Sequence, residues 1–324
     1  MIINIGESMA IFLIVTVCVC GVYYFIGRVF ADFALKRDSG ADTAVKASLQ
    51  QNTEMTPAQI EEENKHNEAR SFSEKHLTEE IEIKSADGLK LYGYLYKNQT
   101  SDPCRYVLLM HGFQDDHKFM EPYAMVYFAK GFHVLIPDQR GHGQSEGKYT
   151  TMGWKEKDDI LRWVRLILER DPKARIVLHG VSMGASSIMM AAGDGFPENV
   201  CVCVSDCGYT TLWSEYLEKM KEMFSLPPSP VLFAASLAAR VRPGFWIQKV
   251  SPLDALRKNH TPMLFIHGDA DDYNPYRMMD ELYKADASVE KQKLTIRGAR
   301  HARSVYTDPD AYWNGVWDFL KRYI

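Results

Sequence analysis

The N-terminal part of the chain lacks charged residues. No Asp, Glu, Lys or Arg lies between residues 8 and 27, and residues 9–26 are dense in Ile, Val, Phe, Leu and Tyr. A helix of this length crosses a hydrocarbon core of about 30 Å. A cleaved signal peptide carries a basic N-terminal segment and a small-residue cleavage site. Residues 1–7 lack Lys and Arg, and no such site follows. We therefore expect a single-pass transmembrane anchor at residues 8–27, with a signal peptide or a buried core helix as the alternatives.

The basic residues near this anchor indicate its orientation. They lie on its C-terminal side alone and are interspersed with three aspartates: Arg28, Lys36, Arg37 and Lys46 among Asp32, Asp38 and Asp42. By the positive-inside rule this distribution keeps the large C-terminal domain in the cytoplasm.

An excess of positive charge is absent from the chain as a whole. Its 38 Lys and Arg face 42 Asp and Glu, which gives a net charge of −4. This balance argues against nucleic-acid binding, which requires a basic face. The 324 residues, 46% of them hydrophobic, suit one folded domain of roughly 250 residues with additional segments.

The six cysteines lack the spacing of a metal site or of a disulfide framework. Two of them, Cys18 and Cys20, lie in the expected anchor, and the others are Cys104, Cys201, Cys203 and Cys207. Free buried thiols favour a reducing compartment. We find no ligand cluster and no phosphate-binding loop in the sequence, so we expect neither a metal nor an organic cofactor.

A strand-turn-helix pattern surrounds Ser182. The apolar run at residues 175–178 predicts a short buried strand, and the small residues at 185–192 predict a helix. Between them, residues 180–184 read G-x-S-x-G, the nucleophile-elbow pattern. A serine in such a tight turn projects its Oγ clear of the backbone. The turn also directs the Met183 N–H toward the position of a substrate oxyanion.

Strands and helices alternate along most of the chain, and such alternation predicts an α/β fold. After an antiparallel hairpin we expect a mostly parallel twisted sheet with helices on both faces. Strands are expected at residues 78–84, 89–97, 105–110, 132–137, 175–178, 200–205, 262–267 and 293–296, and further helices at 119–130, 152–170 and 309–323.

The alternation stops at residues 207–250, which predicts a helical cap inserted above the strand ends. Two helices, at 212–224 and 231–240, are separated by a proline-rich break. Apolar cap side chains could line an acyl pocket or pack the cap on its own domain: Met220, Met223, Phe224, Phe233 and Trp246. The domain itself is expected at 78–324, after a polar tether at 28–77 that is partly helical from residue 57 to 72.

A nucleophilic serine needs a base, and the base needs an acid to orient it. His301 follows the last predicted strand in a loop, where its side chain can reach over the strand ends. The histidines within or directly after strands are expected to make structural hydrogen bonds: His111, His142, His179 and His267.

Three aspartates follow the penultimate strand, and Asp271 is the expected acid among them. It lies just clear of the strand, whereas Asp269 is expected to cap the turn and Asp272 to face solvent. Asp206, at the end of the strand before the cap, is the alternative. The order Ser182, Asp271, His301 is the Ser…Asp…His order expected on this kind of sheet.

A second oxyanion donor is expected at Phe113. The loop after the strand at 105–110 begins with His111 and Gly112, and glycine allows the backbone to approach a substrate closely. The Phe113 N–H is then the partner of the Met183 N–H. Each donor of this kind contributes on the order of 3 kcal/mol to lowering the barrier.

Five motifs in this order resemble the α/β-hydrolase superfamily. They read HGF at 111–113, DQRGHGQS at 138–145, HGVSMG at 179–184, HGDADDYNP at 267–275 and GARHA at 298–302. The chain is similar to membrane-anchored, uncharacterised serine hydrolases of Gram-positive bacteria, near the prolyl-oligopeptidase-like and esterase branches. The resemblance covers residues 78–324 and implies a structural role for the second motif. Asn274 departs from it, because the family usually has an apolar residue before the proline.

The predicted function is hydrolysis of an acyl ester through an acyl-enzyme intermediate. The membrane anchor and the apolar cap favour a lipid-like or amphiphilic ester as the substrate. A serine peptidase or amidase would use the same residues, and a non-catalytic protein that retains the fold is the third interpretation. Nothing in the sequence indicates an oligomeric state.

Overall fold

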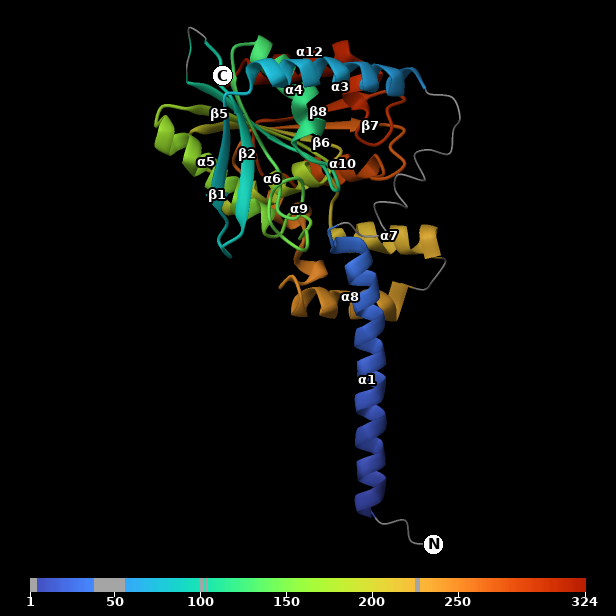
Figure 1. Cartoon of the computed structure of the whole chain (residues 1–324). Helices are drawn as coiled ribbons and strands as arrows, with labels where there is room; N and C mark the ends of the chain where they lie inside the picture. The colour runs from blue at the N-terminus through green and yellow to red at the C-terminus, as the bar shows by residue number, and fades with distance from the viewer. Residues whose placement is uncertain (1–4, 38–55, 100–101, 103, 225–227) are drawn as a thin grey trace.

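The computed structural model describes residues 5–37, 56–99, 102, 104–224 and 228–324 of the chain. The side chains of residues 5–7, 222–224 and 228 lie outside this description. A globular body contains the sheet, and a long helix, α1 (Ile5–Leu35), projects from it toward the N-terminus (Figure 1).

One mixed sheet forms the centre of the body, with strand order β1-β2-β4-β3-β5-β6-β7-β8. β2 pairs antiparallel with β1 and β4, and all pairings from β4 to β8 are parallel. The strands are β1 (Glu79–Lys84), β2 (Lys90–Tyr96), β3 (Arg105–Met110), β4 (His133–Pro137), β5 (Arg175–Val181), β6 (Val200–Asp206), β7 (Met263–Gly268) and β8 (Lys291–Ile296). Their parallel arrangement brings the carboxyl ends of β3, β5, β6 and β7 to one edge.

Helices cover both faces of the sheet, as the sequence predicts (Figure 1). On one face Tyr123 and Tyr127 of α4 pack with Tyr312 and Val316 of α12. On the other face α5, α6, α9 and α10 cover the strands. The helices of the body are α3 (Pro57–His76), α4 (His117–Ala129), α5 (Glu156–Arg170), α6 (Met183–Asp194), α7 (Leu212–Phe224), α8 (Pro228–Val241), η1 (Ile247–Lys249), α9 (Pro252–Leu256), α10 (Arg277–Ala285), α11 (Ser304–Thr307) and α12 (Pro309–Leu320).

Helix α3 does not behave as part of a free tether. It begins at a capping box in which the Thr56 side chain and Gln59 bond each other's backbone N–H. Its Ala69 is buried, and Phe72 stacks on Tyr96 of β2 with ring centroids 5.6 Å apart. An ion pair of 2.8 Å joins Glu62 to Arg303 beside α11. Within the expected tether at 28–77, residues 57–76 thus form a helix that a few apolar contacts hold on the body; residues 38–55 lie outside the described residues.

Helix α1 is longer than the expected anchor, and its C-terminal part packs on the body. A Cβ on Gly27 would lie 2.1 Å from the carbonyl oxygen of Ala234 in α8, so the two helix backbones touch there. Ala31 and Leu35 are buried in one apolar cluster with cap residues. The Leu35 carbonyl accepts a hydrogen bond of 2.9 Å from the Thr150 N–H. The structure thus places the end of α1 within the domain.

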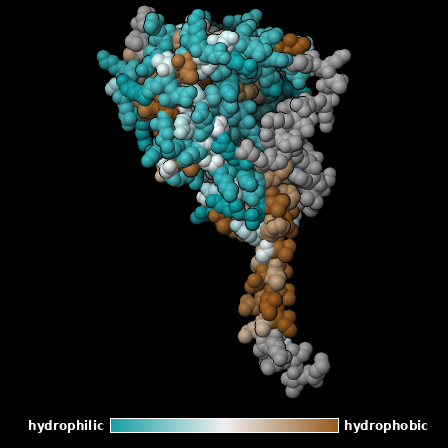
Figure 2. All heavy atoms as spheres, viewed as in Figure 1, coloured by the Kyte–Doolittle hydropathy of each residue, from teal (hydrophilic) through white to brown (hydrophobic). Residues whose placement is uncertain are grey.

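Polar groups reinforce this contact. The Tyr149 hydroxyl donates to the Asp32 carboxylate at 2.7 Å and accepts from Arg242 Nε at 2.7 Å. These three residues come from α1, the loop after β4 and the segment after α8. In the space-filling view the exposed part of α1 is a hydrophobic column below a largely hydrophilic body (Figure 2).

Candidate active site

Ser182 lies in the sharp turn between β5 and α6. Its φ of +54° is in the left-handed region, which is costly for a residue with a side chain. The turn is possible because the residues at 180 and 184 are glycines, where a Cβ would overlap the neighbouring backbone. A Cβ on Gly180 would lie 2.5 Å from the Gly184 carbonyl carbon, and one on Gly184 would lie 2.1 Å from the Met110 oxygen. The Ser182 N–H donates to the Asp206 carbonyl at 2.8 Å and holds the turn at the carboxyl edge of the sheet.

A chain of hydrogen bonds runs from Ser182 through His301 to Asp271. Ser182 Oγ lies 2.9 Å from His301 Nε2, and His301 Nδ1 lies 2.9 Å from Asp271 Oδ2. His301 comes from the loop after β8 and Asp271 from the loop after β7. The structure therefore brings together the three residues that the sequence nominates, although they are 119 and 30 positions apart.

The Asp271 carboxylate is buried, and four groups donate to it. The backbone N–H groups of Tyr273 and Asn274 donate to Oδ1 at 2.9 and 2.8 Å, and His267 Nε2 lies 3.2 Å from Oδ2 beside His301. Burial alone would raise the pKa of Asp271, but the charge and hydrogen bonds of the two histidines outweigh it and hold that pKa well below its usual range. The acid is therefore ionised at neutral pH.

Asn274 has a specific role in this loop. Its side-chain amide donates to the Cys207 carbonyl at 2.7 Å, and its own carbonyl lies 2.8 Å from His267 Nε2. The residue that departs from the family pattern thus ties the Asp271 loop to the end of β6.

Asp206, the alternative acid, belongs to a different network. The Tyr312 hydroxyl donates to its Oδ2 at 3.0 Å and lies 3.0 Å from His179 Nε2, whose Nδ1 lies 3.0 Å from the Tyr127 hydroxyl. Burial raises the pKa of Asp206 to about 6 and lowers that of His179 to about 3. Since no hydrogen bond joins Asp206 to His301 among the described residues, the geometry favours Asp271.

The two expected oxyanion donors lie on loops that meet at Ser182. A Cβ on Gly112 would lie 3.6 Å from the Ser182 Cβ, so the loop after β3 is packed against the nucleophile. Within the described residues, neither the Phe113 nor the Met183 N–H donates to a protein acceptor. Both amides are thus available to an oxygen bound beside Ser182.

His111, His142 and the second motif make structural hydrogen bonds. His111 Nε2 accepts from the Gln139 N–H at 2.9 Å, and His142 Nε2 accepts from the Gln114 N–H at 3.1 Å. Burial lowers the pKa of each histidine to about 4, so both are neutral. Arg140 forms two bonds to Asp159, at 2.7 and 2.8 Å.

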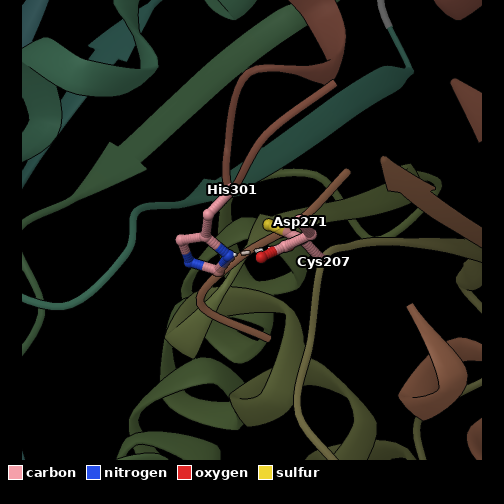
Figure 3. A group of neighbouring side chains, drawn as sticks. All are labelled: Cys207, Asp271 and His301. Atoms are coloured by element: carbon pink, nitrogen blue, oxygen red, sulfur yellow. Dashed lines mark hydrogen bonds and ion pairs between the residues drawn. The ribbon is translucent and has the colours of Figure 1, made fainter. Parts of the chain in front are cut away.

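Cys207 lies beside Asp271 and His301, with the three ligand atoms within 4.8 Å of one another (Figure 3). Such a set could in principle hold a metal ion. His301 and Asp271 are directed at each other, however, and burial raises the pKa of the Cys207 thiol well above its usual value. A protonated thiol is a poor metal ligand, so this group does not fit a metal site.

Two cavities share Phe113, which lies on the loop that packs against Ser182. An apolar cavity of about 100 Å³ lies under the cap and is lined by Phe30, Ala31, Phe33, Ala34, Phe113, Met152, Tyr216, Lys219, Met220, Leu232, Ala235, Ile247 and Tyr273. A more polar cavity of about 490 Å³ opens between α1 and α3 and includes Lys36, Arg37, Glu62, His66, Asp115, Asp116 and Lys118.

The apolar cap side chains named from the sequence lie in different surroundings. Met220 lines the apolar cavity. Phe233 and Trp246 are 51% and 41% exposed and do not line it, because α8 turns Leu232 and Ala235 inward instead. The side chains of Met223 and Phe224 lie outside the described residues. The sequence reasoning missed two contributors, the end of α1 and Tyr273, whose ring lies 4.8 Å from that of His301.

Comparison with known proteins supports the architecture. A family model described as serine aminopeptidase, S33, matches residues 101–259. The uncharacterised protein YqkD of Bacillus subtilis is 30% identical over 261 residues, which cover 80% of this chain and 84% of that protein. The thiohydrolase aneE of Aspergillus aculeatus is 32% identical over 149 residues, which cover 44% of this chain and 43% of that one.

Among solved structures, the esterase Pf2001 of Pyrococcus furiosus matches with a TM-score of 0.63 and 25% identity, covering 77% of this chain and 93% of that one. The matched share of this chain corresponds in size to the body without α1. The likeness confirms the fold that the sequence motifs predict.

Proposed function

This chain belongs to the α/β-hydrolase superfamily and is a hydrolase, and we propose that it cleaves acyl ester bonds with Ser182 as its nucleophile. The observation that carries the proposal is the hydrogen-bonded chain Ser182–His301–Asp271, with both distances at 2.9 Å. Such a chain is the arrangement that serine hydrolases on several unrelated folds use for nucleophilic acyl transfer. The similarity to an esterase, Pf2001, and to a thiohydrolase, aneE, favours an ester-like substrate over a peptide.

In the proposed reaction His301 Nε2 accepts the Ser182 proton while Oγ attacks the ester carbonyl. Asp271 holds the imidazole with its proton on Nδ1 and stabilises the imidazolium that forms. The ionised state of Asp271 suits this role, because a neutral acid could not offset the new charge. The Phe113 and Met183 amides donate to the oxyanion of the tetrahedral intermediate.

Collapse of this intermediate breaks the ester C–O bond, and His301 delivers its proton to the departing alkoxide. Water then attacks the acyl-enzyme with His301 as the base, and the acid product leaves. Of the two cavities that include Phe113, one has an apolar lining and the other a polar lining, and an amphiphilic ester has an apolar part and a polar part. We assign the acyl group to the apolar cavity and the alcohol to the polar one.

The proposal includes retention of α1 as a membrane anchor. The helix has one stretch, residues 8–35, that is long and apolar enough to cross a membrane. A signal sequence is removed, but Ala31 and Leu35 are part of the buried core of this domain. Removal of α1 would expose that core, which supports an uncleaved anchor. The basic residues on the C-terminal side of the anchor then place the hydrolase domain in the cytoplasm by the positive-inside rule.

The test is replacement of the nucleophile in the full-length protein purified in detergent. We expect Ser182→Ala to abolish both p-nitrophenyl ester turnover and labelling by a fluorophosphonate probe. Ser205→Ala is the matched control, because Ser205 is a buried serine on the neighbouring strand whose hydroxyl only contacts Met189. It should keep both activities. Labelling that persists in Ser182→Ala would refute the assignment of the nucleophile.

The substrate class is tested with the same protein against p-nitrophenyl esters and aminoacyl p-nitroanilides. Faster turnover of esters supports the proposal. Turnover of anilides alone would favour the peptidase alternative, for which the name of the matching family model is the supporting observation. If the probe does not label the parent protein and the protein hydrolyses neither class of substrate, a non-catalytic role is favoured.

A further inference from the structure

The end of the anchor helix forms part of the apolar cavity beside the site. Phe30, Ala31, Phe33 and Ala34 of α1 line this cavity together with residues from the cap. These four positions follow directly after the stretch that would lie in the bilayer. The rest of the cavity wall includes Phe113, whose amide is a proposed oxyanion donor.

The depth of α1 in a bilayer places this wall near the lipid. A helix needs about 20 residues to cross the hydrocarbon core, so a span that begins at Ser8 ends near Gly27. At Gly27 the α1 backbone touches Ala234 of α8. The edge of the hydrocarbon core therefore lies at α8, and the cavity wall begins at Phe30, within one helical turn of that edge.

The outer face of α8 has the chemistry expected at this depth. Phe233, Leu237 and Val241 repeat every four residues on one side of the helix and are 51, 36 and 61% exposed. Helix α8 lies across α1 on the side of the body that faces the N-terminus (Figure 1). Exposed apolar side chains in this position are shielded from water by the same bilayer that receives α1.

From this arrangement we infer that α1 is a wall of the acyl-binding pocket and that the substrate is a long-chain acyl ester drawn from the bilayer. The inference rests on the proposed function and names its substrate class. The acyl chain enters along the side of α1, beside the point where α1 and α8 touch, and its carbonyl end reaches Ser182 past Phe113. Since a cavity of about 150 Å³ holds benzene, the 100 Å³ cavity holds roughly four carbons of the chain, and the remainder follows α1 into the lipid.

The composition of the wall supports this occupant. Apart from Lys219, whose ammonium lies 4.2 Å above the Tyr273 ring, the lining residues carry apolar or aromatic surface. A sugar, a nucleotide or a charged peptide would lose its hydration there and would find few polar partners, namely the Tyr216 and Tyr273 hydroxyls and Lys219. An alkyl chain leaves the bilayer for an equally apolar surface, and one that arrives from water, as in an assay with soluble esters, gains burial worth about fourfold in kcat/KM for each methylene group.

The experiment fills or enlarges the pocket from the α1 side. We expect Ala34→Phe to lower kcat/KM for p-nitrophenyl octanoate at least tenfold while that for p-nitrophenyl acetate changes less than threefold. Phe30→Ala should instead raise kcat/KM for dodecanoate relative to octanoate. Val29→Phe is the matched control on the same turn, since Val29 is 51% exposed and outside the cavity, and it should leave the chain-length profile unchanged.

A second measurement separates this inference from the proposed function. Displacement of a fluorescent fatty acid by dodecanoate reports occupancy of the pocket without any chemical step. We expect Ala34→Phe to weaken this binding at least tenfold, and Ser182→Ala to leave it unchanged. If Ala34→Phe alters neither the binding nor the chain-length profile, α1 is not a wall of the pocket. A parent protein that hydrolyses no ester but binds dodecanoate in a manner sensitive to Ala34→Phe would refute the proposed reaction and support the pocket.

Discussion

The Asp271→Asn substitution probes the proposed acid through the details of its hydrogen bonds. In the parent protein Oδ1 accepts from the N–H groups of Tyr273 and Asn274 at 2.9 and 2.8 Å. An asparagine must place its carbonyl oxygen there, because its NH₂ group cannot accept. The NH₂ group then occupies the position of Oδ2 and faces His301 Nδ1.

This exchange reverses the tautomer of His301. An NH₂ donor opposite Nδ1 requires that nitrogen to be unprotonated, so the proton of a neutral imidazole moves to Nε2. Nε2 then donates to Ser182 Oγ and can no longer accept its proton. A change of this kind lowers kcat by about ten-thousandfold, which corresponds to about 5 kcal/mol of transition-state stabilisation.

The assay is steady-state hydrolysis of p-nitrophenyl butyrate, with circular dichroism to show that the variant is folded. Asp206→Asn is the control, since Asp206 accepts from Tyr312 at 3.0 Å and an amide oxygen can accept the same bond. We expect this control to change kcat by a few-fold at most. The reasoning is refuted if Asp271→Asn retains more than a tenth of the parental kcat, or if Asp206→Asn loses as much activity as Asp271→Asn.

The remaining predictions concern stability. Burial raises the pKa of Asp206 from 3.8 to about 6, so the folded state keeps this proton after the unfolded chain has released it, and Asp206 lowers stability as pH rises from 4 to 6. The difference in unfolding free energy between Asp206→Asn and the parent should grow by about 2 kcal/mol over this range; a difference independent of pH would contradict the buried carboxylate. For α3, Phe72→Ala should cost about 2 kcal/mol in urea unfolding, because Phe72 packs on Tyr96 and Phe128, whereas a free tether would show no change.

The candidate site was predictable because each of its residues follows a strand. Parallel strands end at one edge of the sheet, so a loop glycine, a serine, an aspartate and a histidine in the right order meet there. The nucleophile turn adds a geometric constraint, since only glycine at 180 and 184 allows β5, α6 and the end of β3 to approach so closely. The sequence also left Asp206 open as the acid, and only the coordinates distinguish it from Asp271.

The contacts outside the sheet were not predictable in the same way. In α3 a few residues such as Ala69 and Phe72 make the apolar contact, and the polar residues around them hide this face. In α1 the apolar run is continuous, so no periodicity separates its lipid-facing part from its docked part. A weaker signal was present: Gly27, Ala31 and Ala34 follow the i, i+4, i+7 spacing of a helix packed closely on another.

If α1 is the membrane anchor proposed above, its docking also fixes the height of the proposed reaction above the membrane. Asp32 and Arg242 both bond Tyr149, and the loop that follows Tyr149 carries Met152, another wall of the apolar cavity. Tyr149, which bonds α1, and Met152, which lines the pocket, therefore lie on one continuous segment of the chain. A flexible tether would let the domain sample many distances from the lipid, and each distance would require the ester to leave the bilayer by a different amount. A clamped helix holds Ser182 at a single distance, so the acyl chain can remain largely in lipid while its carbonyl is attacked.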